Sequence, residues 1–128
     1  MGSAGTRPVT GAVVKRVVRA IVGAIDPEQI ILFGSRARGA HGMDSDIDLL
    51  VVQSEPFDAA RSRYRESVRA YEAVSGMGVA TDILVYSRPE VEYWRDSLNH
   101  VVARALREGE VLYERPEMRS DARSVRGT

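Results

Sequence analysis

The chain has 128 residues, 44% of them hydrophobic, which is enough for one hydrophobic core of ordinary size but not for two. Eighteen basic and eighteen acidic residues cancel, which excludes a bulk electrostatic attraction to nucleic acid or anionic lipid and requires any polyanion site to be local. The absence of cysteine excludes disulfides and thiolate chemistry, and no apolar run could span a bilayer, so we expect a cytoplasmic protein that does not contact membranes.

The first half of the chain predicts a helix followed by two strands. Residues 1–8 are rich in Gly and Ser and are expected to be a flexible N-terminus. From Val9 to Ile25 apolar residues recur at helical spacing, and Asp26-Pro27 provides a stop. Gln29 to Phe33 is an apolar run rich in β-branched residues, which predicts a buried strand. After a polar loop, Asp46 to Val52 predicts the second strand.

The second half predicts a helix, a strand, a longer helical stretch and a final short strand. In chain order these are a helix over Asp58 to Ser75, a strand over Val79 to Tyr86, helical structure from Pro89 to about Arg107 with a break near Asp96-Ser97, and a strand over Val111 to Tyr113. We therefore expect one domain over residues 9–113, followed by a flexible charged tail over residues 114–128.

Three acidic residues stand where apolar strand residues are expected. Asp46 and Asp48 alternate with apolar neighbours, so both carboxylates lie on one face of their strand, roughly 6.5 to 7 Å apart along it. Asp82 interrupts another apolar strand. Grouped carboxylates repel one another unless a cation intervenes, and hard oxygen ligands without His or Cys suit magnesium or manganese. In the structural alternative, Asp46 caps a turn, Asp48 pairs with a loop arginine and Asp82 marks an edge strand.

A glycine turn follows the first predicted strand. Gly34 lets the backbone approach a ligand closely, and the amides and hydroxyl of Gly34-Ser35 can receive phosphate oxygens. Arg36 and Arg38 lie close by in sequence and suit the neutralisation of a triphosphate, although solvated loop arginines are equally consistent with the pattern. Alone, the turn is ordinary strand punctuation.

The combination of these features is specific. Phe33-Gly34-Ser35, then ten residues, then Asp46-Ile47-Asp48-Leu49, with Asp82 in a later strand, resembles the nucleotidyltransferase superfamily related to DNA polymerase beta, and within it the minimal nucleotidyltransferases. The resemblance covers roughly Val9 to Tyr113. It implies an α/β (α+β) fold with a short mixed sheet flanked by helices. It also implies transfer of a nucleoside monophosphate to a hydroxyl group with release of pyrophosphate.

The resemblance also implies roles for individual residues. Gly34 and Ser35 match the triphosphate-binding turn of the family, Asp46 and Asp48 match its paired metal ligands, and Asp82 matches its third carboxylate, which lies toward the acceptor and is the candidate to deprotonate it. The expected cofactors are two magnesium ions held by Asp46, Asp48 and Asp82, with manganese as an alternative. The expected substrate is ATP or another nucleoside triphosphate.

The acceptor follows only from the resemblance. Minimal nucleotidyltransferases are often paired with a helical HEPN toxin and attach adenylate to one of its tyrosines, so we expect an antitoxin with a HEPN partner. The short chain favours an acceptor site that is shallow, shared with a second copy, or supplied by a partner. Two alternatives are transfer to a tRNA end or a small hydroxyl compound such as an aminoglycoside, and a non-catalytic module that neutralises a partner by contact.

Several other residues are expected to lie outside the site. A series of arginines and tyrosines favours a solvated helix face over a nucleic-acid or partner surface, and an aromatic pair favours an interface. His41 is expected to be exposed, and His100 is expected on a helix without a partner. The series comprises Arg61, Arg63, Tyr64, Arg65, Arg69 and Tyr71, and the aromatic pair is Tyr93 and Trp94.

Overall fold

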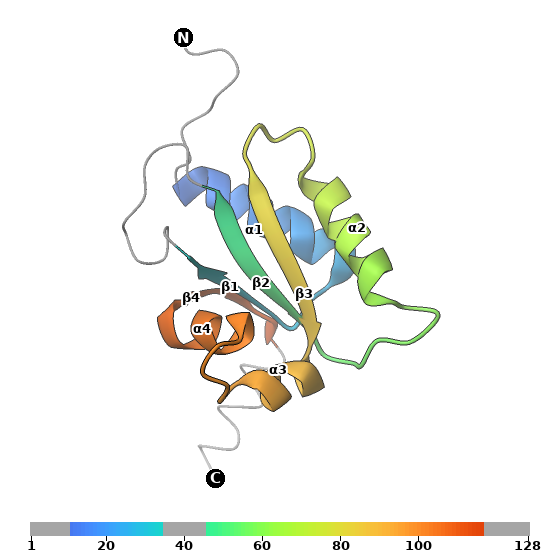
Figure 1. The fold of residues 1–128 in the computed structure, drawn as a ribbon. Helices are drawn as coiled ribbons and strands as arrows, with labels where there is room; N and C mark the ends of the chain where they lie inside the picture. The colour runs from blue at the N-terminus through green and yellow to red at the C-terminus, as the bar shows by residue number, and fades with distance from the viewer. Residues whose placement is uncertain (1–10, 35–45, 117–128) are drawn as a thin grey trace.

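A mixed sheet with helices on both faces is seen in the computed structural model, which describes residues 11–34 and 46–116 (Figure 1). The expected α/β fold with a short mixed sheet flanked by helices is confirmed. The elements in chain order are α1 (Gly11–Ile25), β1 (Gln29–Phe33), β2 (Ile47–Gln53), α2 (Arg63–Val74), β3 (Thr81–Ser87), α3 (Arg88–Trp94), α4 (Val101–Glu108) and β4 (Glu110–Glu114).

The four strands lie in the order β3-β2-β1-β4. β1 pairs antiparallel with both β2 and β4, whereas β2 and β3 are parallel. Parallel strands need a long crossover connection, and here α2 provides it. β2 is therefore a central strand with one neighbour of each direction, and β3 is an edge strand.

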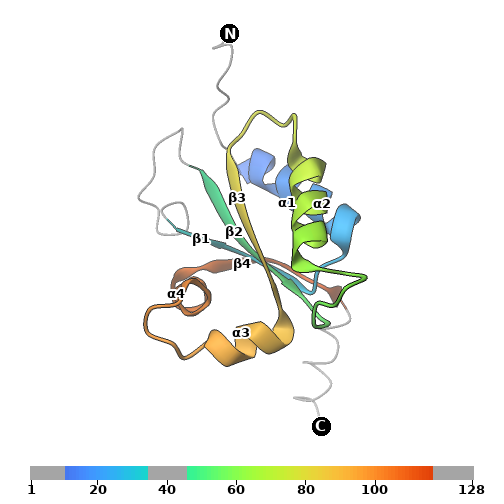
Figure 2. The ribbon, with the colours of Figure 1, turned by 45° about the vertical axis from the view of Figure 1, so that its right-hand side comes forward.

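The larger core lies between the sheet and the helix pair α1 and α2, which share one face in Figure 2. Alternate residues of a strand face opposite sides, so Ile47, Leu49 and Val51 of β2 point into this core and are fully buried. Helix α1 contributes an apolar stripe that includes Val17 and Ile21, both without exposed surface. The expected inward orientation of Ile47 and Leu49 is confirmed.

The opposite face of the sheet carries a smaller core under α3 and α4. It contains Phe33, Leu50 and Val52 from the strands and Val91 and Val102 from the two helices. Helix α3 follows directly after the last residue of β3, so it covers this face at the end of the strand that lies away from residue 82 (Figure 1). The beginnings of β2 and β3 extend beyond it.

The bounds of α2 differ from the predicted ones. The helix begins at Arg63 rather than at Asp58, because the side chain of Ser62 accepts a hydrogen bond from the backbone N–H of Arg65 and caps the helix there. Asp58 instead accepts a hydrogen bond from the backbone N–H of Arg61 at 2.8 Å, which closes a turn. The predicted break between the last two helices is present, since residues 95–100 separate α3 from α4.

The C-terminal end of the domain extends beyond the predicted limit. Glu114, expected to begin a free tail, is the last residue of β4. The guanidinium of Arg115 donates hydrogen bonds to the backbone oxygen of Asp26 at 2.6 Å and to Ser54 Oγ at 3.1 Å. Both residues therefore belong to the fold. Residues 1–10 and 117–128, which include the rest of the predicted termini, lie outside the described residues. No helix in the described ranges is long and apolar enough to cross a membrane.

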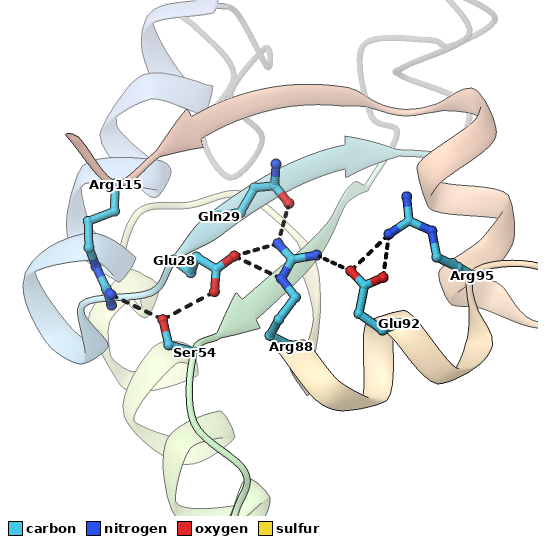
Figure 3. A network of polar contacts seen from close by, with 7 residues as sticks. All are labelled: Glu28, Gln29, Ser54, Arg88, Glu92, Arg95 and Arg115. Carbon is cyan, nitrogen blue, oxygen red and sulfur yellow. Dashed lines mark hydrogen bonds and ion pairs between the residues drawn. The ribbon is translucent and has the colours of Figure 1, made fainter. Parts of the chain in front are cut away.

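One end of the sheet is closed by a network of charged side chains (Figure 3). The buried carboxylate of Glu28 accepts hydrogen bonds from Arg88 Nε at 2.8 Å and from Ser54 Oγ at 3.1 Å. Arg88 also donates to Gln29 at 3.1 Å and forms an ion pair with Glu92 at 3.3 Å. These residues lie at the start of β1, after the end of β2 and after the end of β3. The network therefore joins the strand ends, and the charges of Glu28 and Arg88 compensate each other.

Candidate active site

The turn after β1 contacts a carboxylate directly. Gly34 has a φ of +81°, a conformation that L side chains rarely adopt. A Cβ at this position would lie 2.3 Å from Asp48 Oδ2, so the Asp48 side chain would have to move away. The antiparallel register pairs Phe33 with Asp48 and so brings the turn next to this carboxylate. The backbone angle therefore favours glycine, and any larger residue would also displace the carboxylate of Asp48.

The other predicted residues of this loop cannot be placed. Ser35, Arg36, Arg38 and His41 lie outside the described residues. Their predicted contacts with a triphosphate stay predictions.

The predicted carboxylates meet across two neighbouring strands. Asp48 of β2 is paired with Asp82 of the parallel strand β3, so the two residues are side by side in the sheet. Asp46 directly precedes β2, where the backbone N–H of Ile47 donates to the oxygen of Ala80 and joins the beginnings of the two strands. By strand alternation, all three acidic residues fall on the face that also carries α3 and α4. Asp48 is half-buried, whereas Asp46 and Asp82 are exposed.

The electrostatic environment of Asp48 is unfavourable for a charged group. Burial contributes most to raising the pKa of Asp48 above its ordinary value, and the neighbouring charges of Asp82 and then Asp46 raise it further. The structural alternative pairs Asp48 with a loop arginine, and the arginines of that loop, Arg36 and Arg38, lie outside the described residues, so this pairing is not tested. The edge-strand position of Asp82 does agree with that alternative. Like charges thus gather here without a basic partner in the part of the chain that the structure describes.

The donor set fits a hard divalent cation, although no ready-made cluster is present. Within residues 11–34 and 46–116, no three acidic or His side chains are assembled closely enough to hold a metal ion. The carboxylates supply only oxygen ligands, the kind that magnesium and manganese prefer. Asp48 and Asp82 are neighbours in register, and the exposure of Asp46 and Asp82 leaves their side chains room to rotate toward a shared ion.

One residue of this region was not singled out by the sequence pattern as part of the site. Tyr71, on α2, accepts a hydrogen bond from the backbone N–H of Ile83 at 2.8 Å, and its hydroxyl lies 3.4 Å from Asp82 Oδ1. The contact depends on how α2 packs beside β3, which helical spacing does not reveal. In the sequence, Tyr71 was only one member of a series of arginines and tyrosines.

Most of the arginines on and before α2 are engaged in structural contacts. Arg61 donates to the backbone oxygens of Glu55 and Pro56, and Arg69 donates to the backbone oxygen of Ala24 at 2.8 Å. Arg63 forms an ion pair with Glu90. These contacts explain the arginine series without a nucleic-acid surface.

The aromatic residues near the third and fourth helices also have defined positions. His100 is not within a helix but caps the start of α4, because its Nδ1 accepts a hydrogen bond from the backbone N–H of Val102 at 3.1 Å. Its ring stacks on Trp94 with 4.0 Å between centroids, so the expectation of a His without a partner is wrong. Trp94 packs against the smaller core, whereas Tyr93 is 77% exposed.

A hollow of about 580 Å³ among the described residues is separate from the carboxylates. It lies where α1 ends and α2 begins, and it is lined by acidic and basic side chains including Glu66, Arg65 and Arg69. Arg69 also forms an ion pair with Glu66 at 3.7 Å. The mixed charge gives this hollow no clear preference for an anionic ligand, so the chemistry is better located at the carboxylates.

Known proteins resemble this chain in sequence and in fold. The nucleotidyltransferase-domain family matches residues 14–119. A structure of a Sulfolobus solfataricus protein assigned as a nucleotidyltransferase is 20% identical and covers 82% of this chain and 80% of its own, with a TM-score of 0.56. A toxin–antitoxin structure with AMP-PNP is also 20% identical and covers 78% of this chain and 72% of its own, with a TM-score of 0.50. A comparison with curated proteins finds no match.

The family match spans both acid-bearing strands and the glycine turn, and the chain therefore belongs to the nucleotidyltransferase-domain family. Its enzyme class is that of a nucleotidyltransferase, as the motif predicted. Members of this family generally use a nucleoside triphosphate and a divalent metal ion.

Proposed function

We propose that this protein is a magnesium-dependent enzyme that transfers a nucleoside monophosphate, AMP from ATP, to a hydroxyl group of a protein partner. The observation that carries the proposal is the pairing of Asp48 with Asp82 on neighbouring strands, next to a turn in which Gly34 has a positive φ and lies against the Asp48 carboxylate. An oxygen-only site beside a phosphate-binding type of turn suits a metal-bound triphosphate.

The residues have distinct roles in this proposal. Asp46, Asp48 and Asp82 hold the divalent ions, and manganese can replace magnesium there. Gly34 and Ser35 receive the triphosphate, and Arg36 and Arg38 offset its charge. When bound, the ions polarise the phosphoryl group and stabilise the leaving pyrophosphate.

Asp82 has the role nearest to the acceptor. The exposed carboxylate accepts the proton of the acceptor hydroxyl, whose oxygen bonds to the α-phosphorus while the bond to pyrophosphate breaks. The exposed position of Asp82 on an edge strand suits this role because an acceptor from another molecule can reach it.

The acceptor proposed is a tyrosine of a HEPN toxin, which makes this protein an antitoxin. The resemblance to minimal nucleotidyltransferases supports this partner, and so does the likeness in fold to a toxin–antitoxin structure that contains AMP-PNP. An exposed acceptor site is consistent with an acceptor carried by a second protein.

The nucleotide part of the proposal is tested by calorimetry. The protein is titrated with ATP in the presence and absence of magnesium, beside a variant with Asp46→Ala and Asp48→Ala and a control with Asp96→Ala, an exposed acidic residue outside the site. We expect magnesium-dependent binding by the wild type and the control only. Equal binding by the double variant would refute the proposed site.

The acceptor is tested by mass spectrometry after incubation with ATP and magnesium. The samples are a HEPN protein encoded beside this one, a tRNA pool and a panel of aminoglycosides. An adenylate adduct on a tyrosine of the HEPN protein supports the antitoxin proposal. Adducts found only on RNA or on aminoglycosides would show that one of these is the acceptor instead. Protection from the toxin by the variant with Asp46→Ala and Asp48→Ala would show that contact suffices without catalysis.

A further inference from the structure

The side chain of Tyr71 reaches from a helix to the open edge of the sheet. β3 is an edge strand, so some of its backbone N–H groups have no neighbouring strand to bind. The N–H of Ile83 is such a group, and it donates to Tyr71 Oη at 2.8 Å. The tyrosine is 40% exposed, yet its hydroxyl is held in place by the backbone next to Asp82.

The hydroxyl has one proton to donate and two acceptors within reach. Both the backbone oxygen of Ile83 and Asp82 Oδ1 lie 3.4 Å from Tyr71 Oη. A carboxylate is the stronger acceptor because the hydrogen bond is assisted by its charge. Catalytic hydrogen bonds are often long in ligand-free structures and tighten when the complex forms. When Asp82 is ionised, the proton of Tyr71 is therefore directed to it.

Asp82 has no competing interaction that would fix its orientation. Among residues 11–34 and 46–116, Tyr71 is its only hydrogen-bond or ion-pair partner. An exposed aspartate without a partner samples several rotamers, whereas metal binding and proton transfer require one. The hydroxyl of Tyr71 stands where it can select that orientation.

We propose that Tyr71 is a positioning residue that holds the carboxylate of Asp82 through its hydroxyl, in the orientation needed for metal binding and for deprotonation of the acceptor. This inference rests on the proposed function of Asp82. It adds α2, the crossover between the two acid-bearing strands, to the elements that build the site.

The first test needs neither metal nor nucleotide. Tyr71→Phe keeps the ring and removes only the hydroxyl, and Tyr64→Phe makes the same change on the same helix at a residue that is 77% exposed. The three-bond couplings of the Asp82 β-protons, measured by NMR, report its rotamers. We expect one dominant rotamer in the wild type and in Tyr64→Phe, and averaging in Tyr71→Phe. Averaging in the wild type, or an unchanged rotamer in Tyr71→Phe, would overturn the proposal.

The second test measures Mn²⁺ affinity and steady-state transfer in the same variants. Loss of a hydrogen-bond partner of a metal ligand typically lowers metal affinity or activity by about 10- to 100-fold. Because Tyr71 is partly exposed, we expect kcat of Tyr71→Phe to fall about 10-fold with KM for ATP unchanged, Mn²⁺ to bind more weakly, and Tyr64→Phe to match the wild type. In an Asp82→Ala background the effect of Tyr71→Phe should disappear, and a full effect there would contradict action through Asp82.

The two proposals fail in different ways. If the wild type transfers no nucleotide but Asp82 still depends on Tyr71 for its rotamer, the proposed function is wrong and the contact is real. If transfer is normal in Tyr71→Phe, the inference about Tyr71 is wrong and the proposed function stands. A nucleotide attached to the Tyr71 hydroxyl itself would also overturn the inference, because the hydroxyl would then be the acceptor.

Discussion

The carboxylates at the two ends of the sheet have opposite kinds of neighbours. At the end closed by the Glu28 and Arg88 network, the buried carboxylate is matched by a guanidinium and further hydrogen bonds. At the end where β2 and β3 begin, burial and then the neighbouring charges of Asp82 and Asp46 raise the pKa of Asp48. Within the described residues, the buried charge of Glu28 is therefore paired with a guanidinium, whereas the charged neighbours of Asp48 are acidic, an arrangement that a cation would stabilise. The difference separates structural from functional acidic residues.

The largest expected effect is the loss of nucleotide transfer when Asp48 is changed. Asp48→Asn should lower the rate of nucleotide transfer by about 100-fold or more, because metal ions contribute several kcal/mol to such transition states. The measurement is release of pyrophosphate with ATP and the acceptor, at equal concentrations of folded protein. Asp96→Asn is the matched control, and an Asp48→Asn enzyme of normal rate would place the chemistry elsewhere.

Substitutions in the Glu28 and Arg88 network should lower the free energy of unfolding without changing the rate of nucleotide transfer. Arg88→Met leaves the buried carboxylate of Glu28 without its guanidinium partner, which we expect to cost about 3 kcal/mol in the free energy of unfolding. Urea denaturation measures this cost. Arg95→Ala, which breaks only an exposed ion pair with Glu92, should cost about 0.5 kcal/mol or less. A loss of transfer by folded Arg88→Met, at unchanged concentration of native protein, would show that the two ends are coupled.

An intermediate effect on stability and ATP binding is expected from a substitution of Gly34, which lies against Asp48. Gly34→Ala introduces a Cβ at a positive φ and against Asp48, so we expect a loss of about 1 to 3 kcal/mol in the free energy of unfolding and weaker ATP binding. Gly76→Ala is the control, because this glycine also has a positive φ but a Cβ there meets no atom within 4 Å. If both variants bind ATP equally well, the approach of Gly34 to Asp48 does not matter for the nucleotide.

The smallest effect concerns pH. Because the pKa of Asp48 is raised in the fold, the native state binds this proton more tightly than the unfolded chain does. Its contribution to stability is therefore present at low pH and is lost as pH rises from the ordinary pKa through the raised one. In metal-free buffer Asp48→Asn should melt above the wild type at neutral pH, with a smaller gap at low pH.

Magnesium provides the control for this pH prediction. Added magnesium should raise the melting temperature of the wild type but not that of Asp48→Asn, with ionic strength matched by NaCl. A gap between the two proteins that does not depend on pH would show that repulsion at Asp48 is not its cause.

Local sequence signals were sufficient for the strands but not for every contact of the site. The bounds of β1 were predicted correctly, because an uninterrupted apolar run lies between a proline and a glycine. The common face of Asp46 and Asp48 followed from strand alternation alone. The adjacency of Asp48 and Asp82 was expected only as a third carboxylate from a neighbouring strand, since period-two alternation does not fix the register between strands.

Contacts that depend on helix packing were missed. The start of α2 was predicted five residues early because polar residues before Ser62 fit a helical pattern as well as a turn. The approach of Tyr71 to Asp82 depends on where that helix lies against the edge strand, and no local pattern contains this information. The capping role of His100 was missed because the sequence pattern placed this residue within a helix, whereas α4 begins at Val101.

The parallel pairing of β2 and β3 affects the order in which the site forms during folding. Asp48 and Asp82 are brought together only when the whole α2 crossover has closed, and contacts between parts of the chain that are distant in sequence form slowly during folding. The hairpin between β1 and β2 can form earlier because its strands are closer in sequence. The glycine turn can thus approach Asp48 before the third carboxylate arrives, so a partly folded chain lacks the assembled carboxylates. Catalytic competence should then appear only with completion of the native topology.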